Sequence, residues 1–475
     1  MRALVLVHRW LGVACCVLFA MWFASGIIMH FVPFPDLTEG ERIGGLAPLD
    51  TARARYGPGE AVIASGLRDA TRARMLSRID GLVYIVHGAA ATRAVSATNL
   101  SPALVQSPRV ALAIAVEHAR RRGMDAALAA LAELADYDQW TVPNGLDAHR
   151  PLYRIALNDD PATELYVSSA TGEVVRDTTR RERWWNFAGS VVHWIYPTVL
   201  RRDWRAWDAV VWALSLVAFV GAISGALLGP LRLIVAQGHI GSPYQGWQAW
   251  HHWLGLGCMT FLLTWIFSGW LSMDHGRLFS TGKPSPAEAA AFAGAASLEN
   301  LPAQELRLVR EDVLEVEWFA LDGRIYRRER VGVSAQRLSP AGESASPGRE
   351  FLQAFEATTA MRLAPGCAPA AVAHATDHYP IASRMPGAPV YRSVCGDTWF
   401  HVDGANGALL EKLDPSRRVY RWAYGALHTL DFPALAARPS LRTSVIVLLC
   451  GLGLAFSLTA VVIGWRRLRQ SISVP

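Results

Sequence analysis

A histidine-bearing apolar segment occurs twice in this chain, and the repeat constrains the fold more than any other feature. One copy runs from His8 to Gly26 and the other from His251 to Gly269, at a constant offset of 243 residues. In both copies Trp-Leu-Gly, a second Trp and a terminal Ser-Gly follow the His at the same spacing. An ionisable side chain in a membrane-length apolar segment is energetically costly. Its repetition therefore indicates that the two histidines have a function together.

Apolar residues are concentrated in four blocks, which predict a bundle of membrane-spanning helices. The chain has 475 residues, of which 52% are hydrophobic and 18% charged, and the blocks cover 4–32, 209–231, 253–273 and 444–465. Each block supplies about the 20 residues that a helix needs to cross a bilayer. The first block is too long for a secretory signal and carries His8 and Arg9, so we interpret it as a retained helix.

Arginines at the short connections predict the topology. The positive-inside rule places both chain ends, the loop 232–252 and the tail 466–475 in the cytoplasm. The basic residues that carry this prediction are Arg2, Arg9, Arg232, Arg466, Arg467 and Arg469. The long segments then lie on the opposite face, which is the periplasm if this is the inner membrane of a Gram-negative bacterium.

The repeat continues outside the apolar blocks. The aromatic segments 184–208 and 419–443 carry His193 and His428 at an offset of 235, and each leads into the next apolar block. One architecture is therefore built twice, as a helix, an outer domain, a His-bearing segment and a helix. Because each half holds two helices, we expect a pseudo-two-fold axis along the membrane normal.

The outer domains, 33–183 and 274–418, have mixed α and β patterns. Residues 109–134 are Ala-rich with helical periodicity, whereas 152–157 alternate as a strand does. The second domain contains Cys367 and Cys395, which can close a disulfide in an oxidising compartment. The fold class predicted is thus a four-helix, internally duplicated membrane bundle with two α+β domains.

Paired imidazoles between helices are suited to hold haem iron. The preferred cytoplasmic-side pair is His8 with His251, and His252 is adjacent. On the outer side any two of four histidines can serve, with the symmetric pair slightly favoured; the four are His30, His193, His275 and His428. This inventory fits two b-type haems, and three are also compatible with it.

The repeated sequence pattern resembles the PepSY-associated transmembrane proteins. The resemblance rests on the His-x-Trp-Leu-Gly openings, the late Ser-Gly, Thr171-Gly172-Glu173, Asn406-Gly407 and Leu427-His428-Thr429, and it covers nearly the whole chain. Met273 stands where His30 would have its repeat partner. Some members of that family are inner-membrane haem proteins that reduce ferric siderophores. The resemblance therefore implies PepSY-like outer domains and a ferric-chelate reductase, an oxidoreductase.

The sequence also bears on the electron donor and on an alternative function. No Gly-rich dinucleotide fingerprint follows a strand on the cytoplasmic side, so the electron donor is expected to be quinol, a free reduced flavin or a partner protein. The modest net charge of +6 is scattered, and no nucleic-acid partner is expected. The alternative is a haem-free membrane-anchored protein that binds or takes up a metal complex or peptide. No catalytic acid or base is assigned, and the particular ferric substrate is left open.

Overall fold

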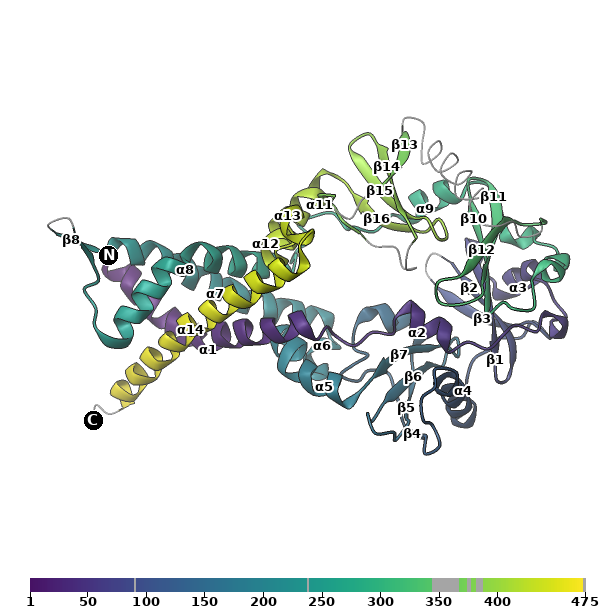
Figure 1. Ribbon diagram of the computed structural model, residues 1–475, viewed down its shortest axis with the longest axis horizontal. Coiled ribbons are helices and arrows are strands. Elements are labelled where there is room, and N and C mark those ends of the chain that lie inside the picture. The colour runs from purple at the N-terminus through teal and green to yellow at the C-terminus, as the bar shows by residue number, and fades with distance from the viewer. Residues whose placement is uncertain (89–90, 237–238, 344–366, 374–376, 382–387, 473–475) are drawn as a thin grey trace.

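The computed structural model has a bundle of four long helices at one end and β-sheets at the other (Figure 1). It describes residues 1–472 except 89–90, 237–238, 344–366, 374–376 and 382–387. The bundle consists of α1 (Arg2–Phe31), α7 (Trp204–Leu231), α8 (Gly246–Leu271) and α14 (Pro439–Ile472). All four are long and apolar enough to cross a membrane, so the predicted number and position of these helices are confirmed for the described residues.

The order of the helices in the bundle follows the sequence repeat. Helix α1 packs against α7 and α14, and α8 packs against the same two helices. The repeat copies α1 and α8 therefore lie diagonally opposite each other across the bundle axis. Both chain ends lie away from the sheets (Figure 1), so we name this the terminal end of the bundle and the other the domain end.

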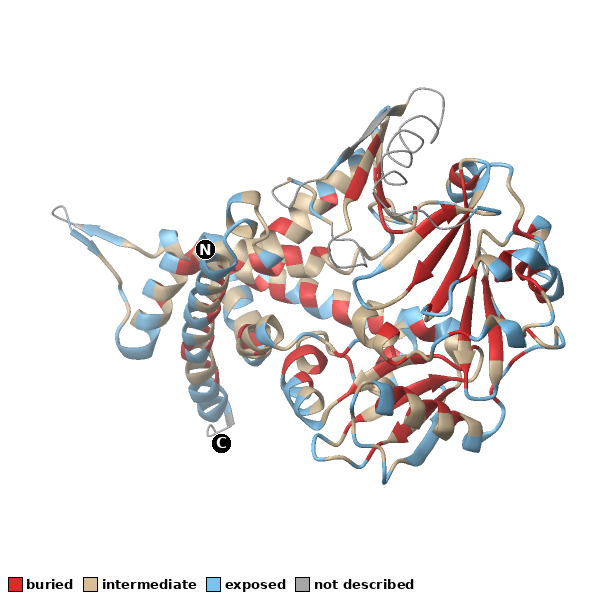
Figure 2. Ribbon diagram, turned by 45° about the vertical axis from the view of Figure 1, so that its right-hand side comes forward, coloured by how far each residue is buried: buried red, intermediate tan, exposed pale blue. Residues whose placement is uncertain are grey.

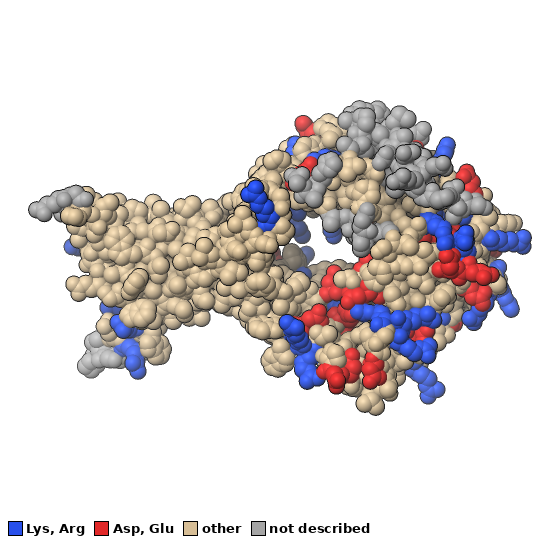
Figure 3. Space-filling model, in the orientation of Figure 1, with Lys and Arg blue, Asp and Glu red and all other residues tan. Residues whose placement is uncertain are grey.

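The outer surface of the bundle is apolar. Val17, Leu227 and Leu448 are exposed on three different helices, where water would be an unfavourable neighbour. Figure 3 shows charged side chains over the sheets and near both ends of the bundle, with a band of uncharged surface between them. Figure 2 shows buried residues along the bundle interior and in the sheets. This distribution is what a helix bundle in lipid requires.

A six-stranded antiparallel sheet is built from both halves of the chain. Its order is β12-β11-β10-β1-β2-β3, with β1 (Arg72–Arg78), β2 (Gly81–His87), β3 (Thr92–Ser96), β10 (Glu315–Leu321), β11 (Arg324–Arg330) and β12 (Gln336–Pro340). The two central strands pair with Arg74 opposite Glu317. These two residues are 243 apart, the offset of the helix repeat, so the pseudo-two-fold axis passes between them.

Each half also has a four-stranded antiparallel sheet of its own. The first lobe contains β4 (Ala130–Ala135), β5 (Leu152–Ala156), β6 (Glu164–Ser168) and β7 (Val174–Thr178), and α4 (Pro108–Arg121) covers it. The second lobe contains β13 (Cys367–Val372), β14 (Val390–Cys395), β15 (Thr398–Asp403) and β16 (Leu409–Leu413). A disulfide joins Cys367 and Cys395 on neighbouring strands.

Short elements connect these parts. A hairpin of β8 (Ile234–Ala236) and β9 (His239–Gly241) links α7 to α8. The remaining helices are α2 (Glu39–Gly44), α3 (Pro58–Ser65), α5 (Arg180–Asn186), α6 (Thr198–Arg201), α9 (Pro286–Ala293), α11 (Pro415–Tyr420), α12 (Leu427–Thr429) and α13 (Pro433–Ala436). Short 3₁₀ helices are η1 (Thr51–Arg53), η2 (Asn144–His149), η4 (Leu298–Asn300) and η5 (Ala303–Leu308), and π-helices are η3 (Phe187–Val191) and η6 (Arg421–Ala426).

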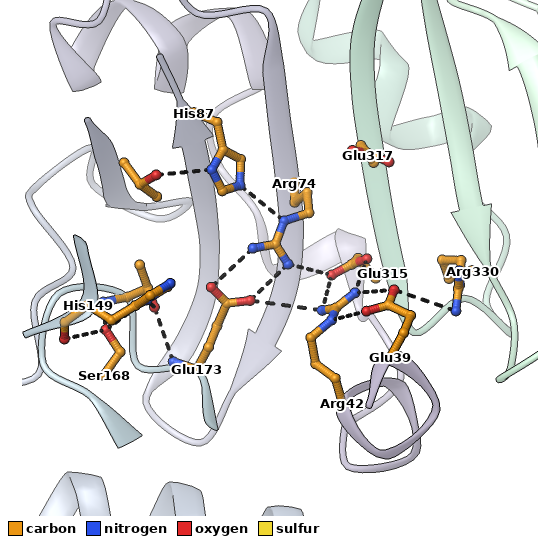
Figure 4. Close-up of polar contacts among 12 residues, drawn as sticks. Glu39, Arg42, Arg74, His87, His149, Ser168, Glu173, Glu315, Glu317 and Arg330 are labelled. Carbon is orange, nitrogen blue, oxygen red and sulfur yellow. Dashed lines mark hydrogen bonds and ion pairs between the residues drawn. The ribbon is translucent and has the colours of Figure 1, made fainter. Parts of the chain in front are cut away.

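A buried ionic network ties the six-stranded sheet to the first lobe (Figure 4). Glu315 on β10 is fully buried and accepts from Arg42 at 2.7 Å and from Arg74 at 2.9 Å. Arg74 also donates to Glu173, in the hairpin of the first lobe, at 2.8 Å. Removing one member of such a network leaves an uncompensated buried charge, so these contacts hold the parts in one arrangement.

Titration of the buried groups predicts acid sensitivity of the sheet region. Burial alone would raise the pKa of Glu173, but Arg74 and Arg42 outweigh it and lower that pKa to about 2. Burial and the Arg74 charge lower the pKa of His87 to about 4. The Glu173 contribution to stability is complete above the unfolded carboxyl pKa of 4.5 and is lost as the pH falls towards 2. The contribution of His87 to stability is complete above its unfolded pKa of 6.5 and is lost as the pH falls towards 4.

We therefore expect the free energy of unfolding of the sheet region to fall continuously from pH 7 to pH 3. Urea unfolding monitored by tryptophan fluorescence at a series of pH values measures it. A midpoint that does not change between pH 7 and pH 4 would contradict the assignment for His87.

Candidate functional site

The first candidate site lies at the terminal end of the bundle, where two histidines meet across the axis. His8 on α1 and His251 on α8 have ring centroids 6.3 Å apart and ring planes inclined by 36°. They hold equivalent positions in the sequence repeat, so the pair straddles the pseudo-two-fold axis. The structure thus brings together the two residues that the sequence favoured for the cytoplasmic side.

A hydroxyl group on a neighbouring helix holds each of these rings. Nδ1 of His8 lies 3.2 Å from Ser224 Oγ on α7, and Nδ1 of His251 lies 3.0 Å from Thr459 Oγ1 on α14. Ser224 and Thr459 are themselves 235 residues apart, the offset of the second part of the repeat. A ring whose Nδ1 is engaged in this way presents Nε2 as its metal-binding nitrogen.

The second candidate site lies at the domain end and repeats this arrangement. His193 and His428 have ring centroids 6.3 Å apart and ring planes inclined by 62°. Their Nδ1 atoms lie 3.0 Å from Ser25 Oγ on α1 and 3.2 Å from Ser268 Oγ on α8. These serines belong to the repeated Ser-Gly pairs, which explains why both copies of the segment keep that dipeptide.

Irregular backbone positions the second pair. The π-helices η3 and η6 come directly before the segments that carry His193 and His428, and π-bulges are frequent at functional sites. Two residues after each histidine the chain turns through a left-handed residue, Ile195 with φ 51° and Leu430 with φ 52°. Both halves therefore leave the helical conformation at equivalent positions just after the histidine.

The other three histidines predicted as ligands are bonded elsewhere. Nε2 of His30 lies 2.9 Å from Thr443 Oγ1, and Nδ1 of His275 lies 2.6 Å from a carboxylate oxygen of Asp208. His252 uses both ring nitrogens, Nδ1 with Ser242 Oγ and Nε2 with the Gly229 carbonyl, each at 2.8 Å. Ring contacts therefore pair His193 with His428 among the four outer histidines.

The spacing of both pairs suits a metal ion held between two imidazoles. Metal–nitrogen bonds of about 2 Å on either side of one ion keep the ring centroids roughly 6 Å apart. Among the described residues no group of three or more His, Cys, Asp or Glu side chains is gathered to hold a bare ion. A two-ligand site needs further donors, and a macrocycle supplies four of them in its plane.

A cavity of about 640 Å³ adjoins the first pair. Its walls include His8, His251 and Gly12, and a Cβ atom added at Gly12 would meet no other atom within 4 Å. Basic side chains also line the cavity at the terminal end, namely Arg9, Arg232, Arg466 and Arg467. The cavity is therefore apolar in its depth and cationic where the charged residues of the helix ends gather.

Glycine is required close to the first pair. A Cβ atom at Gly225 would lie 2.7 Å from Cε1 of His8, a distance that real Cβ atoms do not show. The residue before it, Ser224, is the one that hydrogen-bonds His8. A small residue and a hydroxyl thus act together on α7, one by admitting the ring and the other by orienting it.

Aromatic side chains fill the bundle between the two pairs. The ring of Phe23 lies 6.0 Å from that of Trp265 and 6.5 Å from that of Phe261. The Trp22 indole donates to the His193 carbonyl at 3.0 Å. The interior near the second site is therefore aromatic, and Trp22 helps to position His193.

The hydroxyl partners and the cationic lining are the functional features that sequence reasoning missed. Ser224 and Thr459 could have been found from the sequence, because they are separated by the same 235 residues that separate His193 from His428. Arg9, Arg232, Arg466 and Arg467 were used only as topology signals. Their position along the cavity depends on how four separate helix ends meet.

No family model matches the chain, and no similar sequence was found among curated proteins. The fold and site define a protein with four membrane-length helices, α+β lobes and two symmetric histidine pairs.

Proposed function

We propose that this chain is an inner-membrane b-type haem protein that passes electrons from the cytoplasmic side or the quinol pool to the periplasm. Its substrate would be a ferric siderophore or another ferric chelate, from which Fe(II) is released. The observation that carries the proposal is the occurrence of two histidine pairs with the same 6.3 Å ring separation at opposite ends of one bundle.

The residues around the first pair fit a haem. The cavity of about 640 Å³ falls within the usual range for cofactor sites, about 300 to 1,000 Å³. His8 and His251 would hold the iron, and Gly12 keeps the cavity wall beside them free of a side chain. Arg9, Arg232, Arg466 and Arg467 would pair with the propionate carboxylates at the polar edge.

Haem bound at each pair supplies reversible one-electron chemistry. The protein's own part is to bind, orient and shield. The four hydroxyls of Ser25, Ser224, Ser268 and Thr459 fix the orientation of the imidazoles. The apolar helices exclude water, and electron transfer needs no acid or base from the chain.

Topology and resemblance support the direction of transfer. The terminal end, with its arginines, is expected in the cytoplasm, and the lobes in the periplasm. The two sites are roughly 25 Å apart along α1, from the 17 residues between His8 and Ser25. The sequence resemblance to PepSY-associated membrane proteins, some of which reduce ferric siderophores, agrees with this use of the two sites.

The visible spectrum of the detergent-purified protein, oxidised and dithionite-reduced, tests the proposal. We expect a low-spin b-type spectrum with about two haems per chain. The reduced protein should then be reoxidised by a ferric chelate in the absence of oxygen. A colourless protein from haem-replete cells would overturn the proposal and favour a haem-free binding or uptake protein.

A further inference from the structure

Comparison of the two lobes reveals a local departure from the repeat. In the first lobe Arg154 and Arg183 flank Glu164, with nitrogen–oxygen distances of 3.5 and 3.7 Å. Both guanidinium groups therefore lie beside the carboxylate of Glu164, which partly neutralises their charge. This cluster lies on one edge of the lobe, where β6 begins and α5 follows the sheet.

The second lobe keeps both arginines, but an indole stands in the place of Glu164, and Arg392 forms its ion pair with Asp377 instead, at 2.7 Å. Arg418 and Trp399 follow Arg183 and Glu164 by 235 residues, and Arg392 occupies the position of Arg154 in the strand pairing. The guanidinium carbons of Arg392 and Arg418 lie 5.0 and 4.4 Å from the Trp399 ring centre. At the position of Glu164, contacts with a carboxylate are thus replaced by contacts with an aromatic ring.

A second replacement increases the positive charge at the same place. Glu182, which caps α5 in the first half, is replaced by Arg417 on α11. Arg418 donates to the carbonyls of Asp397 and Leu413, and among the described residues neither Arg417 nor Arg418 forms an ion pair. The two replacements make this edge more positive than its counterpart by three charges.

More rings extend the cluster towards the bundle. Tyr379 packs edge-on against Trp399 at 5.1 Å, and its hydroxyl accepts from the Trp422 indole at 3.0 Å. Arg421 lies over Trp422 at 4.9 Å. We name this set the arginine–tryptophan surface; its residues are Tyr379, Arg392, Trp399, Arg417, Arg418, Arg421 and Trp422. Trp399, Arg418 and Trp422 are partly exposed.

A series of side-chain contacts connects the arginine–tryptophan surface to the second histidine pair. Arg417 lies 4.4 Å from the Tyr420 ring, whose centroid is 5.3 Å from that of Tyr424, which lies 5.6 Å from His428. In the first half the equivalent of Tyr424 is Gly189, which has no ring. The route of rings from surface to histidine therefore belongs to the second half.

We propose that the arginine–tryptophan surface binds an anionic, aromatic metal chelate of the tris-catecholate class. Flat indole faces offer stacking to catechol rings, and Arg417 and Arg418, which form no ion pair among the described residues, offer charge and hydrogen bonds to the phenolate oxygens. A neutral hydroxamate chelate uses neither property to the same extent. This inference rests on the proposed function, because it names the class of ferric chelate that would reach His428.

Binding of a redox-inert gallium analogue separates this inference from electron transfer. Isothermal titration of the full-length protein in detergent would compare a hexadentate gallium(III) tris-catecholate with a neutral gallium(III) tris-hydroxamate. We expect the catecholate to bind about tenfold more tightly, and its binding to weaken as salt is added. Equal binding of the two complexes would overturn the inference.

The repeat provides a matched control variant. Arg418→Gln should weaken catecholate binding by about tenfold, whereas Arg183→Gln, the same change in the first lobe, should leave it unaltered. Equal effects of the two variants would overturn the inference, and unchanged melting of each variant shows that it is folded. A haem-containing protein that fails to bind the gallium chelate overturns this inference alone. A colourless protein that binds it overturns the proposed function alone.

Discussion

Replacing His251 with alanine is expected to remove about half of the haem from the purified protein. The change leaves His8 without its partner imidazole, and a haem held there by His8 alone would be bound more weakly and would be high-spin. His193 and His428 are untouched, so the second haem should stay low-spin. Haem per chain and the reduced visible spectrum measure both effects.

The neighbouring histidine is the matched control. His252 is adjacent to His251, yet its two ring nitrogens are bonded to Ser242 and the Gly229 carbonyl. His252→Ala should therefore keep about two haems per chain. Equal haem loss in the two variants would contradict the assignment of His251 as a ligand. Haem retention in both would place the iron elsewhere.

Neutralising Glu315 is expected to destabilise the sheet region by about 3 to 5 kcal/mol. Glu315→Gln keeps the shape of the buried side chain but leaves the partly buried Arg42 and Arg74 with one carboxylate fewer. The lost charge lies where the shared sheet meets α2 and the first lobe, so both halves should unfold more easily. Urea unfolding at pH 7, followed by tryptophan fluorescence, measures the change.

An exposed ion pair on the same sheet provides the comparison. Asp312 is 51% exposed and pairs with Arg337 on β12. Asp312→Asn should cost no more than about 1 kcal/mol, because solvent screens the pair. If Glu315→Gln were no more destabilising than this control, the buried network would not be holding the sheet region together.

The bundle and the histidine pairs were predictable because their signals are local or repeated. Apolar length alone defines the four helices, and the constant offset identifies His8 with His251 and His193 with His428. Choosing one pair from the four outer histidines needed the structure. The contacts of the two rings with Ser25 and Ser268 and with each other identify the pair, and these long-range contacts cannot be read from the sequence.

Two features of the sheets could not be predicted from the sequence. The helical pattern over 109–134 predicted one long helix, but α4 ends at Arg121 and Gly123 adopts φ 74°, a conformation that ends a helix. Residues 130–135 then form β4, because pairing with β5 outweighs the helical preference of alanine and leucine. The pairing of β1 with β10 joins strands from different halves, which no local pattern reveals.

The shared sheet bears on how the chain arose. If a half-length ancestor formed the same assembly as a symmetric dimer, the residue on the axis faced its own copy. An arginine or a glutamate at that position would have opposed an identical charge, at an electrostatic cost. Arg74 opposite Glu317 is possible only when the two copies have separate codons. Fusion into one chain thus allowed the halves to diverge, here into opposite charges at the centre and elsewhere into lobes with different surfaces.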